Sequence, residues 1–215
     1  MSILNIDCME YMAGQPDQSF DLAIVDPPYG IGAHGGENKT RGGVCKAKDY
    51  KPFFGHDKEP ASIEYFKELK RISKNQIIWG ANHFMQNIGC GSSCWIVWDK
   101  QNYGTALADC ELAYTSFTTA VRKFVFQWNG MLQGDMKNKE ERIHPTQKPV
   151  RLYDWLLQNY AEQGQRIIDT HLGSGSSAIA AHYFGCDFVG CELDPHYYHL
   201  ALERFNKETL QMRLV

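Results

Sequence analysis

The sequence predicts an α/β fold with a mostly parallel, twisted sheet. Short apolar runs alternate with amphipathic helical stretches along most of the chain, which is the pattern of successive strand–helix–strand units. The chain has 215 residues, which is ample for one hydrophobic core and somewhat few for two. We therefore expect a single Rossmann-like domain over residues 1–215, with helices on both faces of the sheet.

Local patterns place the elements in order. Helices are expected at 9–13, 61–73, 150–162, 176–184 and 196–210; within 61–73, Ile63, Phe66 and Leu69 recur on one face. The strands between residues 94 and 128 follow one another without a helix, which predicts an antiparallel segment at one edge of the sheet. Strands are expected at the apolar runs 3–6, 20–25, 76–79, 94–98, 111–114, 124–128, 166–169 and 187–191.

Two polar segments interrupt this pattern. Residues 30–60 are rich in Gly, Lys and Asp, and residues 129–143 are polar as well. Long loops inside compact domains usually carry function, so both are candidate lid segments.

The bulk composition excludes several classes of protein. No stretch approaches the ~18 consecutive apolar residues of a membrane span, and no signal peptide is expected. Seven cysteines without a C-x-x-C pair are typical of reduced thiols in a cytoplasmic protein. Cys90 and Cys94 with His83 lack a second ligand pair, so we expect no metal site. The net charge of −3 is mildly unfavourable for a nucleic-acid-binding protein, but clusters of Lys and Arg offset it locally.

The segment Asp26-Pro27-Pro28-Tyr29 follows the apolar run 22–25 and is the most informative motif. Open α/β sheets build their ligand sites at the carboxyl ends of strands. Each proline fixes φ and removes an N–H, so we expect the local carbonyls to face no competing backbone donor. Rigid acceptors beside an aromatic ring suit a planar base that carries an amino group, although a strand followed by a Pro-Pro turn is the simpler alternative.

A second motif indicates a nucleoside cofactor. The strand 166–169 ends at Asp169 and leads through Gly173 and Gly175 into a helix of small residues. Glu192 lies 19 positions beyond Gly173, at the spacing of an acid that binds ribose hydroxyls. The glycine pattern differs from G-x-G-x-x-G, and no Walker lysine follows it. S-adenosylmethionine is therefore a better candidate than NAD or a nucleoside triphosphate.

Together with the segment His144-Pro145-Thr146-Gln147-Lys148-Pro149, these motifs resemble the amino-group DNA methyltransferases. Their order, with the catalytic motif before the cofactor motif, is similar to the permuted beta group. The resemblance extends from Asp7 to about Phe205. It implies methylation of adenine N6 or cytosine N4 in DNA, with restriction–modification, regulation and mobile-element protection as open roles.

The resemblance also implies roles for individual residues. Asp26 and the Pro27 carbonyl would hold the target amino group, Tyr29 would stack on a flipped base, and Lys148 would hold the methionine carboxylate of the cofactor near a helix N-terminus. Asp26, where cytosine-directed relatives often have Ser, favours adenine. The complete predicted site consists of the catalytic residues Asp26, Pro27, Pro28 and Tyr29, and the cofactor-binding residues Asp7, Cys8, Asp26, His144, Thr146, Lys148, Asp169, Leu172, Gly173, Ser174, Gly175, Glu192 and Leu193.

Two departures from the family pattern affect these expectations. Thr170 and His171 stand where the family usually has Pro-Phe, so the wall of the adenine pocket would differ. The family often carries a sizeable target-recognition insert, whereas only 30–60 and 129–143 are available here. Sequence specificity is therefore expected to be loose or supplied by a partner, and a homodimer is one arrangement that the resemblance suggests.

Three alternatives stay open at this point. A protein-glutamine methyltransferase also uses a Pro-Pro-Tyr motif, but with Asn first and without the segment 144–149. An inactive relative could serve as a nucleic-acid-binding subunit, although Asp26, Tyr29, Asp169 and Glu192 are intact. A methyltransferase of a non-DNA substrate would fit the acidic net charge.

Overall fold

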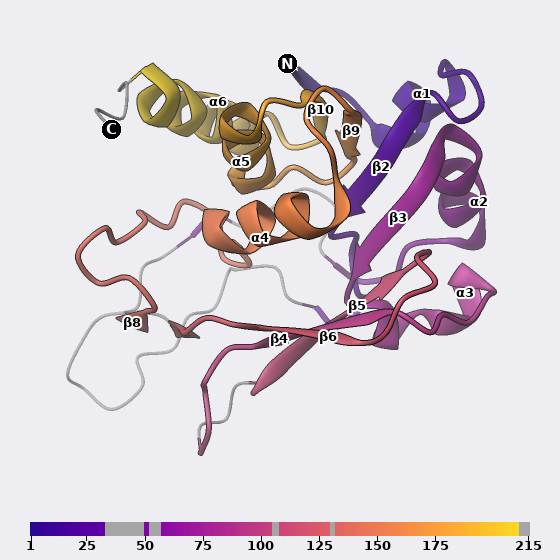
Figure 1. Ribbon diagram of the computed structural model, residues 1–215. Coiled ribbons are helices and arrows are strands. Elements are labelled where there is room, and N and C mark those ends of the chain that lie inside the picture. The colour runs from indigo at the N-terminus through magenta and orange to yellow at the C-terminus, as the bar shows by residue number, and fades with distance from the viewer. Residues whose placement is uncertain (33–49, 52–56, 105–107, 130–131, 211–215) are drawn as a thin grey trace.

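The computed structural model describes residues 1–32, 50–51, 57–104, 108–129 and 132–210. These residues form a twisted sheet flanked by helices (Figure 1). The sheet has eight strands in the order β1-β10-β9-β2-β3-β5-β4-β6. The strands are β1 (Ser2–Asn5), β2 (Phe20–Val25), β3 (Ser73–Trp79), β4 (Trp95–Asp99), β5 (Cys110–Thr115), β6 (Arg122–Val125), β9 (Arg166–Asp169) and β10 (Asp187–Glu192).

The parallel part of the sheet confirms the predicted fold class. Strands β1, β10, β9, β2 and β3 are all parallel to their neighbours within this part. From β9 the chain continues to β10 on one side, and from β2 it continues to β3 on the other side. The order of connection therefore reverses between β9 and β2, which makes their carboxyl ends a topological switch point, where open α/β sheets bind ligands.

The segment 94–128 forms one end of the sheet and contains its antiparallel pairings, as predicted. Strand β5 pairs antiparallel with both β3 and β4. The edge strand β6 pairs parallel with β4. The reversal at β5 brings its first residues, Cys110 and Glu111, to the edge of the sheet where β2 and β3 end.

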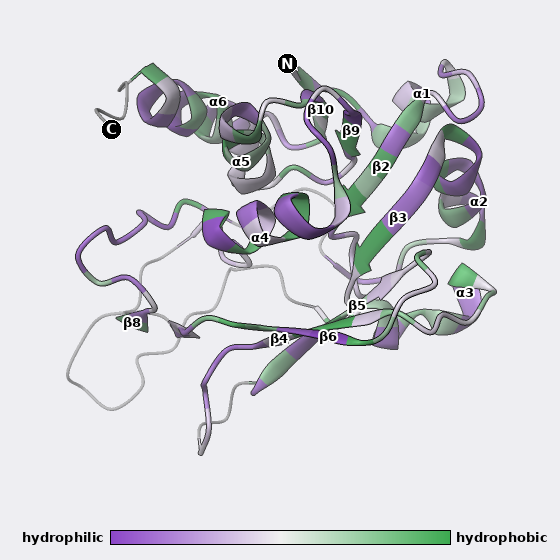
Figure 2. Ribbon diagram, in the orientation of Figure 1, coloured by the Kyte–Doolittle hydropathy of each residue, from purple (hydrophilic) through white to green (hydrophobic). Residues whose placement is uncertain are grey.

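Helices cover both faces of the sheet, also as predicted. Alternate residues of β2 divide between two apolar clusters: Leu22 and Ile24 pack with α4 and α5, whereas Ala23 and Val25 pack with α2. In Figure 2, hydrophobic residues fill the carboxyl-terminal half of β3, whose sequence turns from polar to apolar along the strand. The helices are α1 (Cys8–Ala13), α2 (Ile63–Ile72), α3 (Met85–Ile88), α4 (Val150–Tyr160), α5 (Ser176–Phe184) and α6 (Pro195–Leu210).

Several elements differ from the prediction. Strand β3 begins directly after α2, three residues earlier than expected, because Ser73 bonds back to Leu69 and ends the helix. The short helices η1 (Ala81–His83) and α3 had no periodicity to predict them. The expected strand 124–128 is divided between β6 and β7 (Trp128–Asn129), and β7 pairs with β8 (Leu132–Gln133) inside the predicted polar loop.

The predicted loop 30–60 falls largely outside the described residues. Among the helices that the structure describes, none is long and apolar enough to cross a membrane. In the same part of the chain, no three His, Cys, Asp or Glu side chains gather in a group that could hold a metal ion. Cys94 is buried and contacts Thr119 and Tyr160 through its sulfur, as a core cysteine would.

Candidate active site

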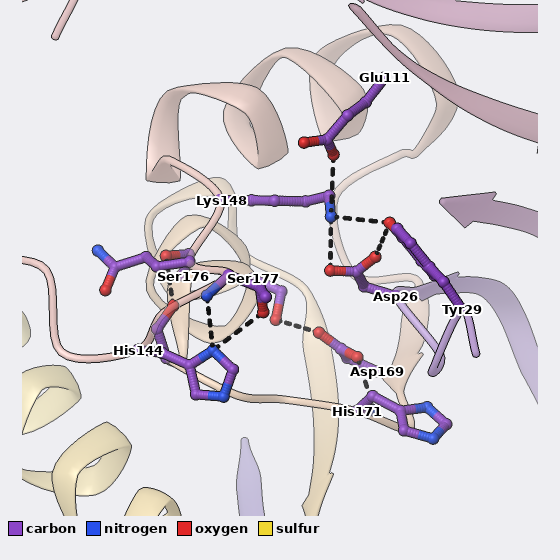
Figure 3. Close-up of polar contacts among 12 residues, drawn as sticks. Asp26, Tyr29, Glu111, His144, Lys148, Asp169, His171, Ser176 and Ser177 are labelled. Atoms are coloured by element: carbon purple, nitrogen blue, oxygen red, sulfur yellow. Dashed lines mark hydrogen bonds and ion pairs between the residues drawn. The ribbon is translucent and has the colours of Figure 1, made fainter. Parts of the chain in front are cut away.

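The carboxyl ends of the parallel strands gather the predicted acidic residues at one edge of the sheet. Asp26 follows β2, Asp169 ends β9, Glu192 ends β10, and Asp7 lies just beyond β1. Asp26 and Asp169 therefore flank the switch point from its two sides. Figure 3 shows the polar groups around these two carboxylates lying beside one another.

Asp26, Tyr29 and Lys148 form a closed hydrogen-bonded triangle (Figure 3). The Tyr29 hydroxyl donates to Asp26 Oδ1 at 2.5 Å, and Lys148 Nζ lies 2.5 Å from Asp26 Oδ2. Lys148 Nζ also donates to the Tyr29 hydroxyl at 3.2 Å. Lys148 is buried, so it is not the solvent-exposed lysine that often precedes a helix. Both oxygens of Asp26 are thereby fixed in orientation.

A second carboxylate reaches Lys148 from the reversed strand β5. Glu111 Oε2 lies 3.2 Å from Lys148 Nζ, and Glu111 Oε1 lies 2.7 Å from Lys100 Nζ. Burial alone would raise the pKa of Glu111, but the two lysines outweigh it and hold that pKa at about 2. Burial lowers the pKa of Lys148, and Asp26 and Glu111 outweigh it, so the pKa is raised. Glu111 and Lys148 are therefore both charged at neutral pH.

The Tyr29 ring is held by residues that the sequence motif does not contain. The His83 ring stacks on it with centroids 5.1 Å apart and planes 15° apart. Gly80 lies against the same ring with φ +67°, and a Cβ atom there would come within 2.1 Å of it. Burial and the charge of Asp26 raise the pKa of Tyr29 well above its usual value, so the hydroxyl keeps its proton. Tyr29 and His83 form a stacked aromatic pair at the site.

The backbone after the motif is clamped by Asp57. Its carboxylate accepts hydrogen bonds from the N–H groups of Tyr29, Gly30 and Ile31, at 2.7, 2.8 and 3.3 Å. The Pro28 carbonyl accepts from the N–H of Ala61 at 3.1 Å. The expectation that the proline carbonyls face no backbone donor is therefore wrong for Pro28, because residues 57–61 return to the motif.

Asp169 is buried and has fixed partners. It accepts from the Ser177 hydroxyl at 2.6 Å and from the His171 N–H at 3.0 Å. Burial nevertheless raises its pKa to about 7. Beside it, the Thr170 hydroxyl bonds the Tyr65 hydroxyl at 2.6 Å and His171 Nδ1 at 3.0 Å. Thr170 and His171, which depart from the family pattern, thus form part of a polar wall between β9 and α2.

The raised pKa of Asp169 predicts a specific pH dependence of stability. Because its folded pKa of about 7 exceeds the ordinary 3.8, the folded protein binds more protons than the unfolded chain between these values, and Asp169 lowers stability as pH rises through that window. Asparagine does not titrate, so the Asp169→Asn variant lacks this loss of stability. Between pH 4 and pH 8 we therefore expect its free energy of unfolding to rise relative to that of wild type by a few kcal/mol, at about 1.4 kcal/mol for each pKa unit. Urea unfolding of both proteins across that range measures it, and a pH-independent difference would contradict it.

The glycine turn lies between Glu192 and His144. Gly173 has φ +54°, and its N–H donates to Glu192 Oε2 at 2.8 Å. Glu192 Oε1 accepts from the Asp194 N–H at 2.9 Å, so this carboxylate is also fixed. The Thr146 hydroxyl lies 3.1 Å from His144 Nδ1, and the nearest atoms to a Cβ at Gly173 would include those of the His144 ring, 3.9 Å away. Burial, followed by the charge of Lys148, lowers the pKa of His144 to about 4, so the ring is neutral.

Other predicted cofactor residues surround this turn. Asp7 caps α1 by accepting the N–H groups of Met9 and Glu10, and Cys8 carries a thiol whose pKa is raised to about 12 by burial. Leu172 is buried under Gly190, whereas Leu193 is half exposed. The structure thus brings Asp7, Cys8, His144, Thr146, Gly173 and Glu192 to one side of the switch point, and Lys148 to the other side with Asp26.

Arg204 supports the turn and was missed by the sequence patterns. Its guanidinium donates to the Ser174 carbonyl and the Ser176 hydroxyl, each at 2.9 Å, and pairs with Glu140 at 2.7 Å. Glu140 in turn accepts from the N–H of Val150 at the start of α4. The Glu140 carboxylate therefore occupies the N-terminus of α4, where the resemblance implied that Lys148 would hold a cofactor carboxylate. Lys148 points toward Asp26 instead. The available signal was spacing: Arg204 lies three residues after Ala201 and seven after Tyr197, so it falls on the same face of the helix α6 as these two apolar residues.

The doubly wound sheet with carboxylates at its switch point is the fold of the Rossmann-like methyltransferases. Within that class, residues 57–203 match the family model described as DNA methylase, of the N6 and N4 type. The match covers more than half of the chain, so the protein belongs to this family, as the motifs predicted. The matched region contains Lys148, Asp169 and Glu192 and begins after Asp26.

Individual relatives agree with this assignment. The chain is 25% identical to the type II methyltransferase M.HinfI of Haemophilus influenzae, with 96% of this chain and 68% of that protein covered. It is also 25% identical to the putative methylase YubD of Escherichia coli K12, with 92% and 87% covered.

Two solved structures share the fold at low sequence identity. The first is TTHA0409, a putative DNA modification methylase from Thermus thermophilus complexed with S-adenosyl-L-methionine, with a TM-score of 0.59, 18% identity, and 99% of this chain and 98% of that chain covered. The second is the cytosine-N4-specific PvuII DNA methyltransferase, with a TM-score of 0.59, 12% identity, and 97% and 89% covered.

Proposed function

We propose that this protein transfers the methyl group of S-adenosylmethionine to the exocyclic amino group of a DNA base, with adenine N6 as the preferred acceptor. One observation carries this proposal: Asp26 and Tyr29 are hydrogen-bonded to each other and to a buried lysine at the switch point of the sheet. A fixed carboxylate beside a stacked aromatic pair can hold a flat base by its amino group and its face.

The residues around the glycine turn fit S-adenosylmethionine. Glu192 presents an oriented carboxylate for ribose hydroxyls, because both of its oxygens already accept backbone N–H bonds. The left-handed turn at Gly173 has no atom closer than 3.9 Å to a Cβ position, which leaves room for close approach of a ligand. Asp7, Cys8, His144 and Thr146 lie around the same turn. The bound cofactor would supply an electrophilic methyl group.

The chain itself supplies alignment and charge. Asp26 would accept an N–H of the target amine, favouring a pyramidal nitrogen whose lone pair is free to attack. Its negative charge would also stabilise the positive charge that develops on that nitrogen during transfer. The Tyr29–His83 pair would stack on the base, which must leave the duplex to reach the site. Alignment of two bound reactants supplies much of the acceleration.

Two features bear on the choice of base and on sequence specificity. Asp26 in place of serine favours adenine, and cytosine N4 is the second candidate because the PvuII enzyme has the same fold. For contact with DNA we propose the segment 129–143, whose described part carries exposed Lys137 and Lys139 and is anchored by paired bonds between Gln133 and Glu140. Residues 30–60 are proposed as the second such segment.

The deciding experiment is transfer of labelled methyl from S-adenosylmethionine to DNA that lacks amino-group methylation, followed by nucleoside analysis. We expect label in N6-methyladenine. Label in N4-methylcytosine would keep the reaction and overturn the choice of base. If the protein binds S-adenosylmethionine but labels no DNA at low salt, where binding to DNA is strongest, then either a partner that supplies specificity is missing or the substrate is not DNA.

A further inference from the structure

We propose that Glu111 is a positioning residue for methyl transfer, which acts by holding the Lys148 ammonium against Asp26 and Tyr29. This inference rests on the proposed function and assigns a role to a residue that lies outside every motif discussed above. Glu111 lies 85 positions from Asp26 in sequence, and only the reversal of β5 brings it to the site.

The Lys148 ammonium contacts three oxygen atoms of the site. An ammonium group has three N–H donors. Here it donates hydrogen bonds to Asp26 Oδ2 at 2.5 Å and to the Tyr29 hydroxyl at 3.2 Å, and it forms an ion pair with Glu111 Oε2 at 3.2 Å. The Glu111 Oε2 atom is buried and accepts no hydrogen bond within the described part of the chain, and Lys148 is 5% exposed. The attraction between Glu111 and the ammonium is therefore little screened by water and holds the ammonium in place beside Asp26 and Tyr29.

Charges of opposite sign alternate along this cluster. Asp26, Lys148, Glu111 and Lys100 form a row of alternating charges, with successive contacts of 2.5, 3.2 and 2.7 Å. A lone ammonium beside Asp26 would cancel much of the negative charge that the target nitrogen needs nearby during transfer. Glu111 shares the ammonium, so Asp26 keeps more of its charge for the substrate. Lys100, at the outer end of the row, balances Glu111 and fixes its other oxygen.

Several titratable groups face Lys148. Tyr29 and Tyr153 of α4 face the same cluster, and their pKa values are well above the usual range because both are buried. His144 and Asp169 also lie near, with pKa values of about 4 and about 7. The pKa of Lys148 is raised in wild type, so a fall in rate at alkaline pH that appears only after Glu111 is replaced is the change that reports on Lys148. Without the charge of Glu111, Asp26 alone opposes the effect of burial, so the pKa of Lys148 falls.

The test compares Glu111→Gln, Glu111→Asp and wild type in single-turnover methyl transfer to DNA from pH 6.5 to 10. We expect Glu111→Gln to be slower by about 10- to 100-fold at pH 7.5, because one of the two carboxylates that hold the ammonium loses its charge. Its rate should also begin to fall at a lower alkaline pH than that of wild type. Glu111→Asp should recover part of both losses, and the dissociation constant of S-adenosylmethionine should stay within about twofold. Glu68→Gln removes a carboxylate paired with Arg71 on α2 and serves as the charge control.

A second measurement needs no substrate. In protein labelled with ¹³C at lysine Cε, the Lys148 resonance, assigned by Lys148→Met, should titrate at lower pH in Glu111→Gln than in wild type. An active wild type with an unchanged profile and an unchanged Lys148 titration in Glu111→Gln would overturn this inference alone. A rate that falls equally at every pH, without recovery in Glu111→Asp, would show a purely structural role and overturn it too. A wild type that labels no DNA would overturn the proposed function.

Discussion

Asp26→Ala is expected to lower the single-turnover rate of methyl transfer by about 10³-fold, near the upper end of losses seen when one preorganised polar group is removed from an active site. The substitution removes the acceptor of the target amine together with the partner of Tyr29 and Lys148. Binding of S-adenosylmethionine, measured by calorimetry, should change by no more than a few-fold, because the glycine turn and Glu192 lie on the other side of the switch point.

The matched control for this variant is Asp17→Ala. Asp17 is a carboxylate with 77% side-chain exposure that pairs with Arg71, away from the site. Its removal should leave transfer within about twofold of wild type, as expected for an exposed ion pair. Transfer by Asp26→Ala at a rate near that of wild type would exclude Asp26 from catalysis and withdraw the proposed function of the motif.

Gly80→Ala is the second variant for which we expect a large effect, and here the cause is steric. The new Cβ would come within 2.1 Å of the Tyr29 ring, which must therefore move. Movement of the ring breaks its bond to Asp26 and its stacking on His83. We expect at least ~100-fold slower transfer, consistent with loss of a bond to a charged group together with a stacking contact.

Gly89→Ala separates this effect from backbone strain. Gly89 has φ +73°, close to the +67° of Gly80, but its Cβ would meet only the Gln86 carbonyl, at 4.0 Å. Both variants should lose about 1–2 kcal/mol of unfolding free energy from the left-handed conformation. Although both variants lose stability, only Gly80→Ala should also lose activity. Equal rates for the two variants would show that the position of the Tyr29 ring is unimportant for transfer.

Local patterns were sufficient for the parallel half of the fold. Each motif here is a short continuous segment, so its strand–turn geometry could be predicted. The motifs are the apolar run before Asp26 and the turn from Asp169 to Gly175, with Glu192 at a fixed spacing after it. The position of β5 could not, because pairing order depends on which strands meet in the folded sheet. The predicted antiparallel segment is present at one end of the sheet, but its local pattern does not show that β5 lies between β3 and β4.

The supporting residues of the site were missed for a similar reason. Glu111, His83 and Asp57 each contact the motif through tertiary structure, and none lies at a fixed sequence offset from Asp26. One signal was available for Glu111: it is a charged residue at the start of an apolar strand, where burial requires a partner of opposite charge. His83 and Asp57 had no comparable signal in their local sequence.

The clamp formed by Asp57 holds the catalytic motif from a position 28 residues beyond Tyr29. Asp57 binds the N–H groups of Tyr29 and Gly30, and Tyr29 forms a bridge with Pro60, so the two ends of this excursion meet beside Asp26. Doubling the length of a loop whose ends are fixed costs only ~0.6 kcal/mol of closure entropy. We therefore expect the bonds between Asp57 and the catalytic motif to persist when residues 33–49 are replaced by a sequence of another length.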